Sequence, residues 1–195
     1  MDAALQTTLS DLAQWLRELA IPFAVIGGIA ATFRGEARFT ADVDVVVGIG
    51  LDEALGLLER LPRSPFQPLF PDVEEILRTS FLLPLRHSMT QVSVDIAIGL
   101  SGFEQQAISR ASEVVLPGCR FPVVSAEDLI LMKLLAGRPR DTDDVRNIML
   151  RQGSALDWNY LFEIGRQLQQ AIDLDLLSEL RRLKADTDET SSEAV

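Results

Sequence analysis

Two aspartates, Asp42 and Asp44, stand two residues apart in the segment TADVDVVVG and constrain the fold more than any other feature of the chain. Residues at i and i+2 of a β-strand project from the same face, so both carboxylates share one face while Val43, Val45 and Val47 pack on the other. Two adjacent like charges need a countercharge, and Mg²⁺ or Mn²⁺, which prefers oxygen ligands, supplies it. The pattern therefore predicts a strand that carries a metal-dependent phosphoryl-transfer site.

A glycine pair, Gly27 and Gly28, ends the apolar segment FAVI and precedes a predicted helix. Glycines at this junction allow a tight strand-to-helix turn. The turn also offers backbone N–H groups and the positive end of a helix dipole to a phosphate. We expect the triphosphate of an NTP to rest there, with its α-phosphorus over the carboxylates.

A third carboxylate, Asp95, interrupts the alternating segment QVSVDIAIG. Aspartate is depleted in strands, and the alternation places Asp95 on a face of small or polar residues. If this strand is a neighbour of the DVDVVV strand, Asp42, Asp44 and Asp95 meet in one cleft, as two-metal nucleotidyl transfer requires. The alternative is that Asp95 caps or solvates an exposed sheet face.

A lysine in an almost wholly apolar helix, Lys133 in SAEDLILMKLLA, marks the second half of the chain, which has only two lysines against sixteen arginines. A buried ammonium needs a partner, and either a ligand phosphate or a carboxylate would serve. Lys133 is thus expected to steady a triphosphate or to form a structural bridge to Asp141 or Asp144. Asp141 is also expected to cap the next helix, with Asp144 completing the capping box.

Four arginines flank these motifs, namely Arg34, Arg38, Arg138 and Arg140. Together they predict a local basic surface for a triphosphate or a nucleic-acid backbone, although a single such arginine is more often solvated surface. The net charge of −11 argues against a chain that grips long nucleic acids through general electrostatics.

The composition indicates where in the cell the protein is expected to be located. No apolar run reaches about 18 residues, and the N-terminal residues lack a basic segment followed by an apolar one, so neither membrane spanning nor secretion is expected. Cys119 is the only cysteine, which excludes an internal disulfide and favours a cytoplasmic location.

Hydrophobic periodicity predicts the order of the elements. Helices are expected over 8–20, 52–61, 103–111, 126–136, 142–151, 157–170 and 174–184, and FLLPLRH and QVSVDIAIG are expected to form a hairpin. The proline-rich segment around 62–71 reads as loop. We expect a core over residues 1–153, a C-terminal helical extension over 154–185 and a disordered acidic tail over 186–195.

The order strand, Gly-Gly, helix, Asp-x-Asp and a later single Asp resembles the nucleotidyltransferase superfamily. The segment SAEDLILMKLLAGRPRDTDDVRNIML resembles the part of the AbiEii/AbiGii toxin family in which a helical Lys precedes a basic, Asp-rich turn. The resemblance covers roughly residues 20–150. It implies an α/β (α+β) fold with a mixed, twisted sheet, packed helices and a C-terminal helical extension. That family often has Gly-Ser where this chain has Gly27 and Gly28, so phosphate would be held by backbone N–H groups alone.

The resemblance also implies an activity: transfer of a nucleoside monophosphate from an NTP such as ATP to an acceptor hydroxyl, with release of pyrophosphate. Asp42, Asp44 and Asp95 would bind the metal. The residues implied around the nucleotide are Gly27, Gly28, Arg38, Lys133, Asp141 and Asp144.

A toxin–antitoxin setting is implied as well, with tRNA as a possible acceptor and a separate antitoxin protein as partner. Three alternatives stay open: an acceptor that is a protein or a small molecule such as an antibiotic, a non-catalytic nucleotide-binding module, and a metal-dependent nuclease.

Overall fold

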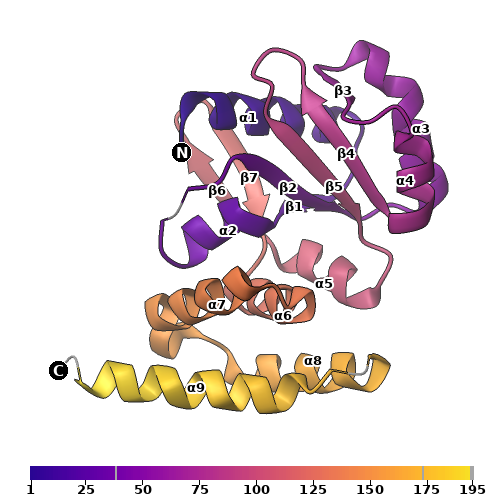
Figure 1. Ribbon diagram of the computed structural model, residues 1–195. Helices are drawn as coiled ribbons and strands as arrows, with labels where there is room; N and C mark the ends of the chain where they lie inside the picture. The colour runs from indigo at the N-terminus through magenta and orange to yellow at the C-terminus, as the bar shows by residue number, and fades with distance from the viewer. Residues whose placement is uncertain (38, 173, 194–195) are drawn as a thin grey trace. The chain divides into compact units, whose positions relative to one another are not determined.

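The computed structural model describes residues 1–37, 39–172 and 174–193, and their side chains as far as Thr187 (Figure 1). The chain divides into two compact units. Unit 1 contains Met1–Ala30 and Phe39–Val124, and unit 2 contains the described residues of Ala31–Arg38 and Ser125–Val195. The division expected from the sequence, into residues 1–153, 154–185 and 186–195, has boundaries that differ from those of the two units, and it stays a prediction.

A seven-stranded mixed sheet forms the centre of unit 1, with strand order β3-β4-β5-β2-β1-β7-β6. The strands are β1 (Phe23–Val25), β2 (Asp42–Val47), β3 (Phe66–Pro68), β4 (Leu82–His87), β5 (Ser93–Ile98), β6 (Ser112–Leu116) and β7 (Cys119–Val123). The pairs β2·β5 and β1·β7 are parallel and the others are antiparallel. The predicted hairpin is β4·β5, and the expected fold class, a mixed α/β sheet with packed helices, is confirmed.

Helices cover both faces of this sheet. They are α1 (Ala3–Glu18), α3 (Leu51–Arg60), α4 (Val73–Ser80) and α5 (Gly102–Arg110), and α2 (Gly27–Arg34) begins in unit 1. The first helix starts five residues earlier than expected, because Asp2 caps it by accepting a hydrogen bond from Leu5 N at 2.8 Å.

The proline-rich segment is more ordered than its composition predicted. It holds a short 3₁₀ helix, η1 (Leu61–Arg63), then the edge strand β3, and it leads into α4. Proline can start a 3₁₀ helix and can occupy an edge strand, since neither place needs its missing N–H. Composition alone therefore hid both elements.

Unit 2 is helical. Its helices are α6 (Ala126–Ala136), α7 (Pro139–Gln152), α8 (Trp158–Ala171) and α9 (Leu176–Glu193), with η2 (Gly153–Ala155) between α7 and α8. Helices α8 and α9 lie side by side and come close at Gly165, where an added Cβ would lie 3.0 Å from Leu180 Cδ1 (Figure 1).

The structure shows helix over residues 186–193, where a disordered tail was expected; residues 194 and 195 lie outside the described residues. Leu180 and Leu183 are fully buried and anchor α9. Thr187 Oγ1 donates to Leu183 O at 3.0 Å, and Arg182 Nη1 donates to Asp186 Oδ2 at 3.2 Å. Helix growth beyond an anchored turn costs little, so packing extends the helix into the acidic segment.

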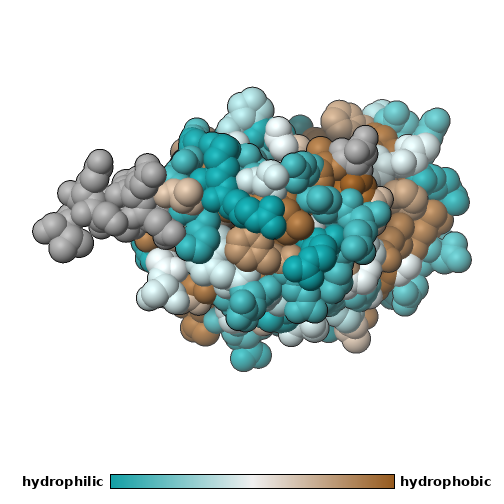
Figure 2. Space-filling model, turned by 90° about the horizontal axis from the view of Figure 1, so that it is seen from below, coloured by the Kyte–Doolittle hydropathy of each residue, from teal (hydrophilic) through white to brown (hydrophobic). Residues whose placement is uncertain are grey.

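The surface seen from below carries mostly hydrophilic side chains, with apolar ones interspersed (Figure 2). Within the described chain, no helix is both long enough and apolar enough to cross a membrane.

Candidate functional site

The carboxylates predicted from the sequence lie on one face of the central strands of unit 1. Strands β2 and β5 are parallel neighbours, with Asp44 directly beside Asp95 and Asp42 directly beside Ser93. Side chains at paired positions point to the same face. The intervening Val43 and the other odd-numbered valines of β2 are fully buried on the opposite face. The expectation that the two strands are neighbours is confirmed.

The charged form of the Asp95 carboxylate is disfavoured by its surroundings. Burial raises its pKa, and the negative charge of Asp42 raises it further. Asp95 forms no hydrogen bond or ion pair with any described residue, whereas Asp42 Oδ1 accepts a hydrogen bond from Thr40 Oγ1 at 2.8 Å. The site therefore favours either a proton on Asp95 or an added positive charge.

Gly27 is adapted to its place beside Asp44. Its φ of +62° lies in the left-handed region, and an added Cβ would lie 1.9 Å from Asp44 Oδ2. The backbone of the same turn is tied to the strand, because Ile26 N donates to Asp44 O at 3.0 Å. Only glycine allows this approach, which brings the N-terminus of α2, with Gly28 in its first turn, next to the Asp44 carboxylate.

These residues fit a hard divalent cation in chemistry. Three carboxylates on one sheet face supply only oxygen ligands. Burial is the main cause of the raised pKa of Asp95, and the charge of Asp42 adds to it, so a cation there would offset that repulsion. As they stand, however, no three His, Cys, Asp or Glu side chains among the described residues are gathered closely enough to hold a metal ion. Binding would require the side chains of Asp42, Asp44 and Asp95 to turn toward a common point.

In unit 2, Lys133 lies in a buried cluster with both of its candidate partners. Lys133 Nζ donates to Asp141 Oδ1 at 3.2 Å and to Asp144 Oδ2 at 2.5 Å. All three residues are buried, with Lys133 only 3% exposed. The structural bridge considered from the sequence is therefore present, and it includes both aspartates.

The prediction that Asp141 is the N-cap of α7 is wrong. The helix begins at Pro139 with Arg138 as N-cap, so Asp141 is its third residue and not its cap. Proline needs no N–H partner at the first helical position, and this lets the helix start earlier than expected. The Asp141 carboxylate still accepts from the Arg138 backbone N–H at 3.2 Å, while Asp144 bonds to Lys133 and completes no box.

Asp141 also has a shifted pKa. Burial alone would raise it, but hydrogen bonds from the Arg138 and Lys133 side chains outweigh burial, so the pKa of Asp141 lies below its ordinary value. Arg138 Nε donates to Asp141 Oδ2 at 2.7 Å. The cations of this cluster therefore keep the Asp141 carboxylate charged.

The expected basic surface is only partly described. Arg38 lies outside the described residues. Arg34 is partly buried and burial lowers its pKa, which the charge of Glu127 opposes. Arg138 is bound to Asp141, and Arg140 is exposed at the start of α7. The role of these arginines in substrate recognition stays a prediction.

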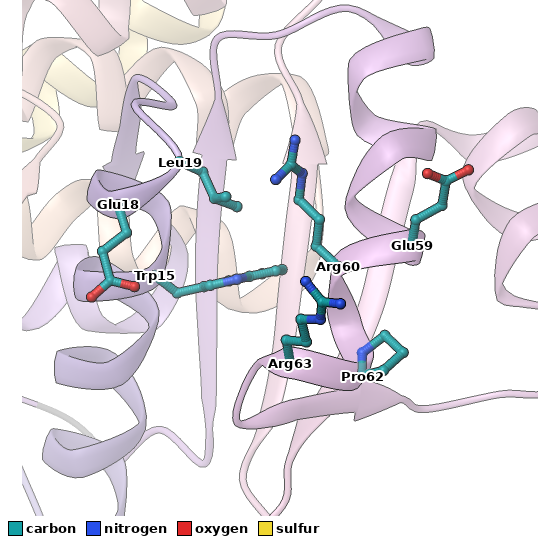
Figure 3. A pocket seen from close by; sticks show the side chains of 7 residues that line it. All are labelled: Trp15, Glu18, Leu19, Glu59, Arg60, Pro62 and Arg63. Atoms are coloured by element: carbon teal, nitrogen blue, oxygen red, sulfur yellow. The ribbon is translucent and has the colours of Figure 1, made fainter.

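A cavity of about 530 Å³ lies between α1 and the segment where α3 ends and η1 begins (Figure 3). Trp15, Arg60 and Arg63 line it, and the Trp15 ring lies 5.4 Å from that of Phe66. Phe66 pairs with His87, which is buried and bonds Asp11 through Nε2 at 3.0 Å. Because His87 and the carboxylates occupy opposite faces, this cavity is separate from the carboxylate site.

Sequence reasoning missed Arg86, the residue before His87 on β4. It pairs with Ser93 on β5, and its Nε is buried with no hydrogen-bond partner. The signal was present in the segment FLLPLRH, where alternation places Arg86 on the face opposite Leu83 and Leu85. The strand pairing that brings it near the carboxylates was needed to make the signal readable.

Two solved structures share the fold. The solution structure of the antibiotic-resistance factor ANT(2'')-Ia aligns with a TM-score of 0.58 at 15% identity, covering 89% of this chain and 97% of that one. The crystal structure of an antigenic nucleotidyltransferase-like protein from Paracoccidioides brasiliensis aligns with a TM-score of 0.50 at 24% identity, covering 75% of this chain and 74% of that one. A search of curated proteins gives no match. These likenesses define the fold as that of nucleotidyltransferases.

The family follows from the sequence match along nearly the whole chain. Residues 3–190 match the family described as "Nucleotidyltransferase of unknown function (DUF6036)", and the chain belongs to that family. The expected nucleotidyltransferase membership is thus confirmed, and the closer resemblance to the AbiEii/AbiGii toxins stays a prediction.

Proposed function

We propose that the protein is a divalent-metal-dependent nucleotidyltransferase that moves a nucleoside monophosphate from an NTP to an acceptor hydroxyl. The observation that carries this proposal is the register of β2 and β5, which sets Asp44 beside Asp95, together with the close approach of Gly27 to Asp44. Membership of a nucleotidyltransferase family and the shared fold support it.

In this proposal the acceptor oxygen forms a bond to the α-phosphorus, and the bond between the α-phosphorus and the bridging oxygen breaks, so pyrophosphate leaves. Asp95 takes the hydroxyl proton, a role that suits a carboxylate whose pKa is raised. Asp42, Asp44 and Asp95 would hold Mg²⁺, which when bound neutralises charge on the triphosphate. The Gly27 and Gly28 turn would hold the phosphates through its N–H groups and the dipole of α2.

The roles of Arg38, Lys133, Asp141 and Asp144 in nucleotide binding are a further part of the proposal. The buried bridge gives Lys133 a structural role that is independent of nucleotide. NTP affinity of a Lys133→Met protein separates the two roles, since a purely structural lysine leaves the affinity of the folded protein unchanged.

We consider two hypotheses for the identity of the acceptor. A toxin-like enzyme acting on tRNA follows from the family resemblance, and an antibiotic acceptor is suggested by the shared fold with an antibiotic-resistance factor. An antitoxin partner belongs to the first hypothesis alone, whereas a cytoplasmic location, expected from the single cysteine, is part of the proposal with either acceptor.

Incubation with each α-labelled NTP, Mg²⁺ and cell extract tests the proposal. We expect one macromolecule or small molecule to become labelled, and label from a γ-labelled NTP to appear in pyrophosphate only. Asp44→Asn should lower transfer by about 10²-fold or more, because it removes a ligand and a countercharge together. Equal labelling by Asp44→Asn and wild-type protein would refute the assignment.

A further inference from the structure

Arg86 lies on the same sheet face as the carboxylates. On the antiparallel pair β4·β5 it is the direct partner of Ser93, and Ser93 is the direct partner of Asp42 on β2. Paired residues point to one face, so Arg86, Ser93 and Asp42 form a row across three strands, next to the row that contains Asp95 and Asp44. With strands about 4.8 Å apart, the Arg86 and Asp42 backbones are separated by roughly 10 Å.

The Nε atom of Arg86 has no hydrogen-bond partner although Arg86 as a whole is only half-buried. This atom is buried, and the side chain forms no hydrogen bond or ion pair with any described residue. Two other arginines of unit 1 form ion pairs: Arg78 with Glu74 and Arg17 with Glu113. Arginine stays charged in proteins, and a buried donor without a partner is costly, so this position favours an anionic ligand.

The strand order shows on which side of the carboxylates Arg86 lies. The Gly27 turn follows β1, which flanks β2, whereas β4 flanks β5 on the other side. Gly27 and Arg86 therefore lie on opposite sides of the β2·β5 pair. In an in-line displacement the attacking and leaving oxygens are also on opposite sides of the phosphorus. If the triphosphate occupies the Gly27 side, Arg86 faces the acceptor.

We infer that Arg86 binds an anionic group of the acceptor, a phosphate or a carboxylate close to the hydroxyl that is modified. That the bound anion belongs to the acceptor rests on the proposed function, whereas the anion site itself does not. The planar guanidinium matches either group through two parallel hydrogen bonds. A polycationic amino sugar would bring like charge to Arg86, so the inference favours acceptors such as RNA ends or phosphorylated small molecules over cationic antibiotics.

The anion site is tested with inorganic phosphate and with acetate, in the full-length protein without NTP or metal. The Nε–Hε signal of Arg86 in an NMR spectrum should shift with phosphate or acetate but not with chloride at equal ionic strength. Arg86→Gln should weaken binding of the preferred anion by about tenfold to a hundredfold, since hydrogen bonds to charged groups are strong. Comparison of phosphate with acetate distinguishes the two sources of the anionic group.

Two further variants serve as controls for this test. Arg78→Gln removes an exposed arginine of the same unit and should leave anion binding unchanged. Arg86→Lys keeps the charge but loses the planar pair of donors, so it should bind phosphate more weakly than wild type and more tightly than Arg86→Gln if all three proteins fold. If Arg86→Gln does not fold, the Nε–Hε shift and Arg86→Lys still decide. Phosphate affinity that is equal in Arg86→Lys and wild type, with no Nε–Hε shift, would overturn the inference.

Transfer assays separate this inference from the proposed function. If no acceptor is labelled by any NTP while phosphate still binds at Arg86, the proposed function fails and the anion site stands. If an acceptor is labelled and Arg86→Gln raises its KM about tenfold with a smaller change in kcat, both are supported. If a cationic amino sugar is labelled with the same KM by Arg86→Gln and wild type, the inference fails and the transferase stands.

Discussion

Replacement of Gly27 by alanine should disturb the carboxylate site through two separable effects. Alanine in the left-handed region, where Gly27 has a φ of +62°, costs about 1–2 kcal/mol. The new Cβ would also lie 1.9 Å from Asp44 Oδ2, so the Asp44 side chain must move. Overpacking of this kind costs about 1–3 kcal/mol, and we expect Gly27→Ala to lower the free energy of unfolding by about 2–5 kcal/mol in total.

Gly118 provides the matched control. Its φ of +76° is similar, but an added Cβ there meets nothing within 4 Å. Gly118→Ala should therefore show the backbone cost alone, about 1–2 kcal/mol. The difference between the two variants measures the steric conflict with Asp44.

The conflict should vanish when Asp44 is removed. Asp44→Gly is the suitable partner change, because even the Asp44 Cβ would lie 2.7 Å from the new methyl group, so alanine at that position would not relieve it. In the double-mutant cycle we expect a favourable coupling of at least about 1 kcal/mol, which reports direct contact.

Urea unfolding followed by Trp15 fluorescence measures these costs, since Trp15 is buried in unit 1. Trp158→Phe makes Trp15 the sole tryptophan and serves as the common background. Equal costs for Gly27→Ala and Gly118→Ala, or no coupling with Asp44→Gly, would refute the reasoning that Gly27 is required by the carboxylate.

Three further outcomes follow from the electrostatics. Because the pKa of Asp95 is raised in the folded state, Asp95 stabilises the fold at low pH, and this stabilisation is lost as the pH rises through that pKa. In metal-free urea unfolding at several pH values, Asp95→Asn should reduce the fall in the free energy of unfolding with rising pH. The same pH dependence in the variant and the wild type would contradict this. Lys133→Met strands two buried carboxylates and should cost about 3–5 kcal/mol in urea unfolding, so wild-type stability would show that the bridge is unimportant. Tyr160→Phe removes the hydroxyl that donates to buried Asp128 and should cost about 1–3 kcal/mol, whereas a neutral result would mean that water replaces it.

The strands that carry the site were predictable because their patterns are local. Alternation around Asp42, Asp44 and Asp95 assigned each carboxylate to a face, and the glycine pair marked the turn. The β4·β5 hairpin followed from two adjacent β-forming segments. Register was not predictable: that Asp44 lies beside Asp95 depends on the parallel pairing of strands separated by α3, β3, α4 and β4.

Other features depend on packing that sequence patterns do not encode. The segment around 62–71, whose prolines read as loop, contributes to η1 and contains β3. Arg86 and Asp42 come near each other only because β4, β5 and β2 pair side by side, which sequence patterns do not show. The helix over 186–193 is set by the buried leucines that precede it, so composition predicted disorder where an anchored helix continues.

The two groups of acidic residues solve the same electrostatic problem in opposite ways. Asp141 and Asp144 are buried with Lys133, and Arg138 adds a second cation, so their charge is balanced within the protein and the pKa of Asp141 is lowered. Asp95 forms no ion pair with a described residue, and its pKa is raised by burial and by a like charge. A structural cluster gains by neutralising itself, whereas a carboxylate left under repulsion contributes only when something outside the chain supplies the charge. This contrast is the reason that the proposed function places the cation and the triphosphate on the face of β2 and β5, and not at the buried bridge of α6 and α7.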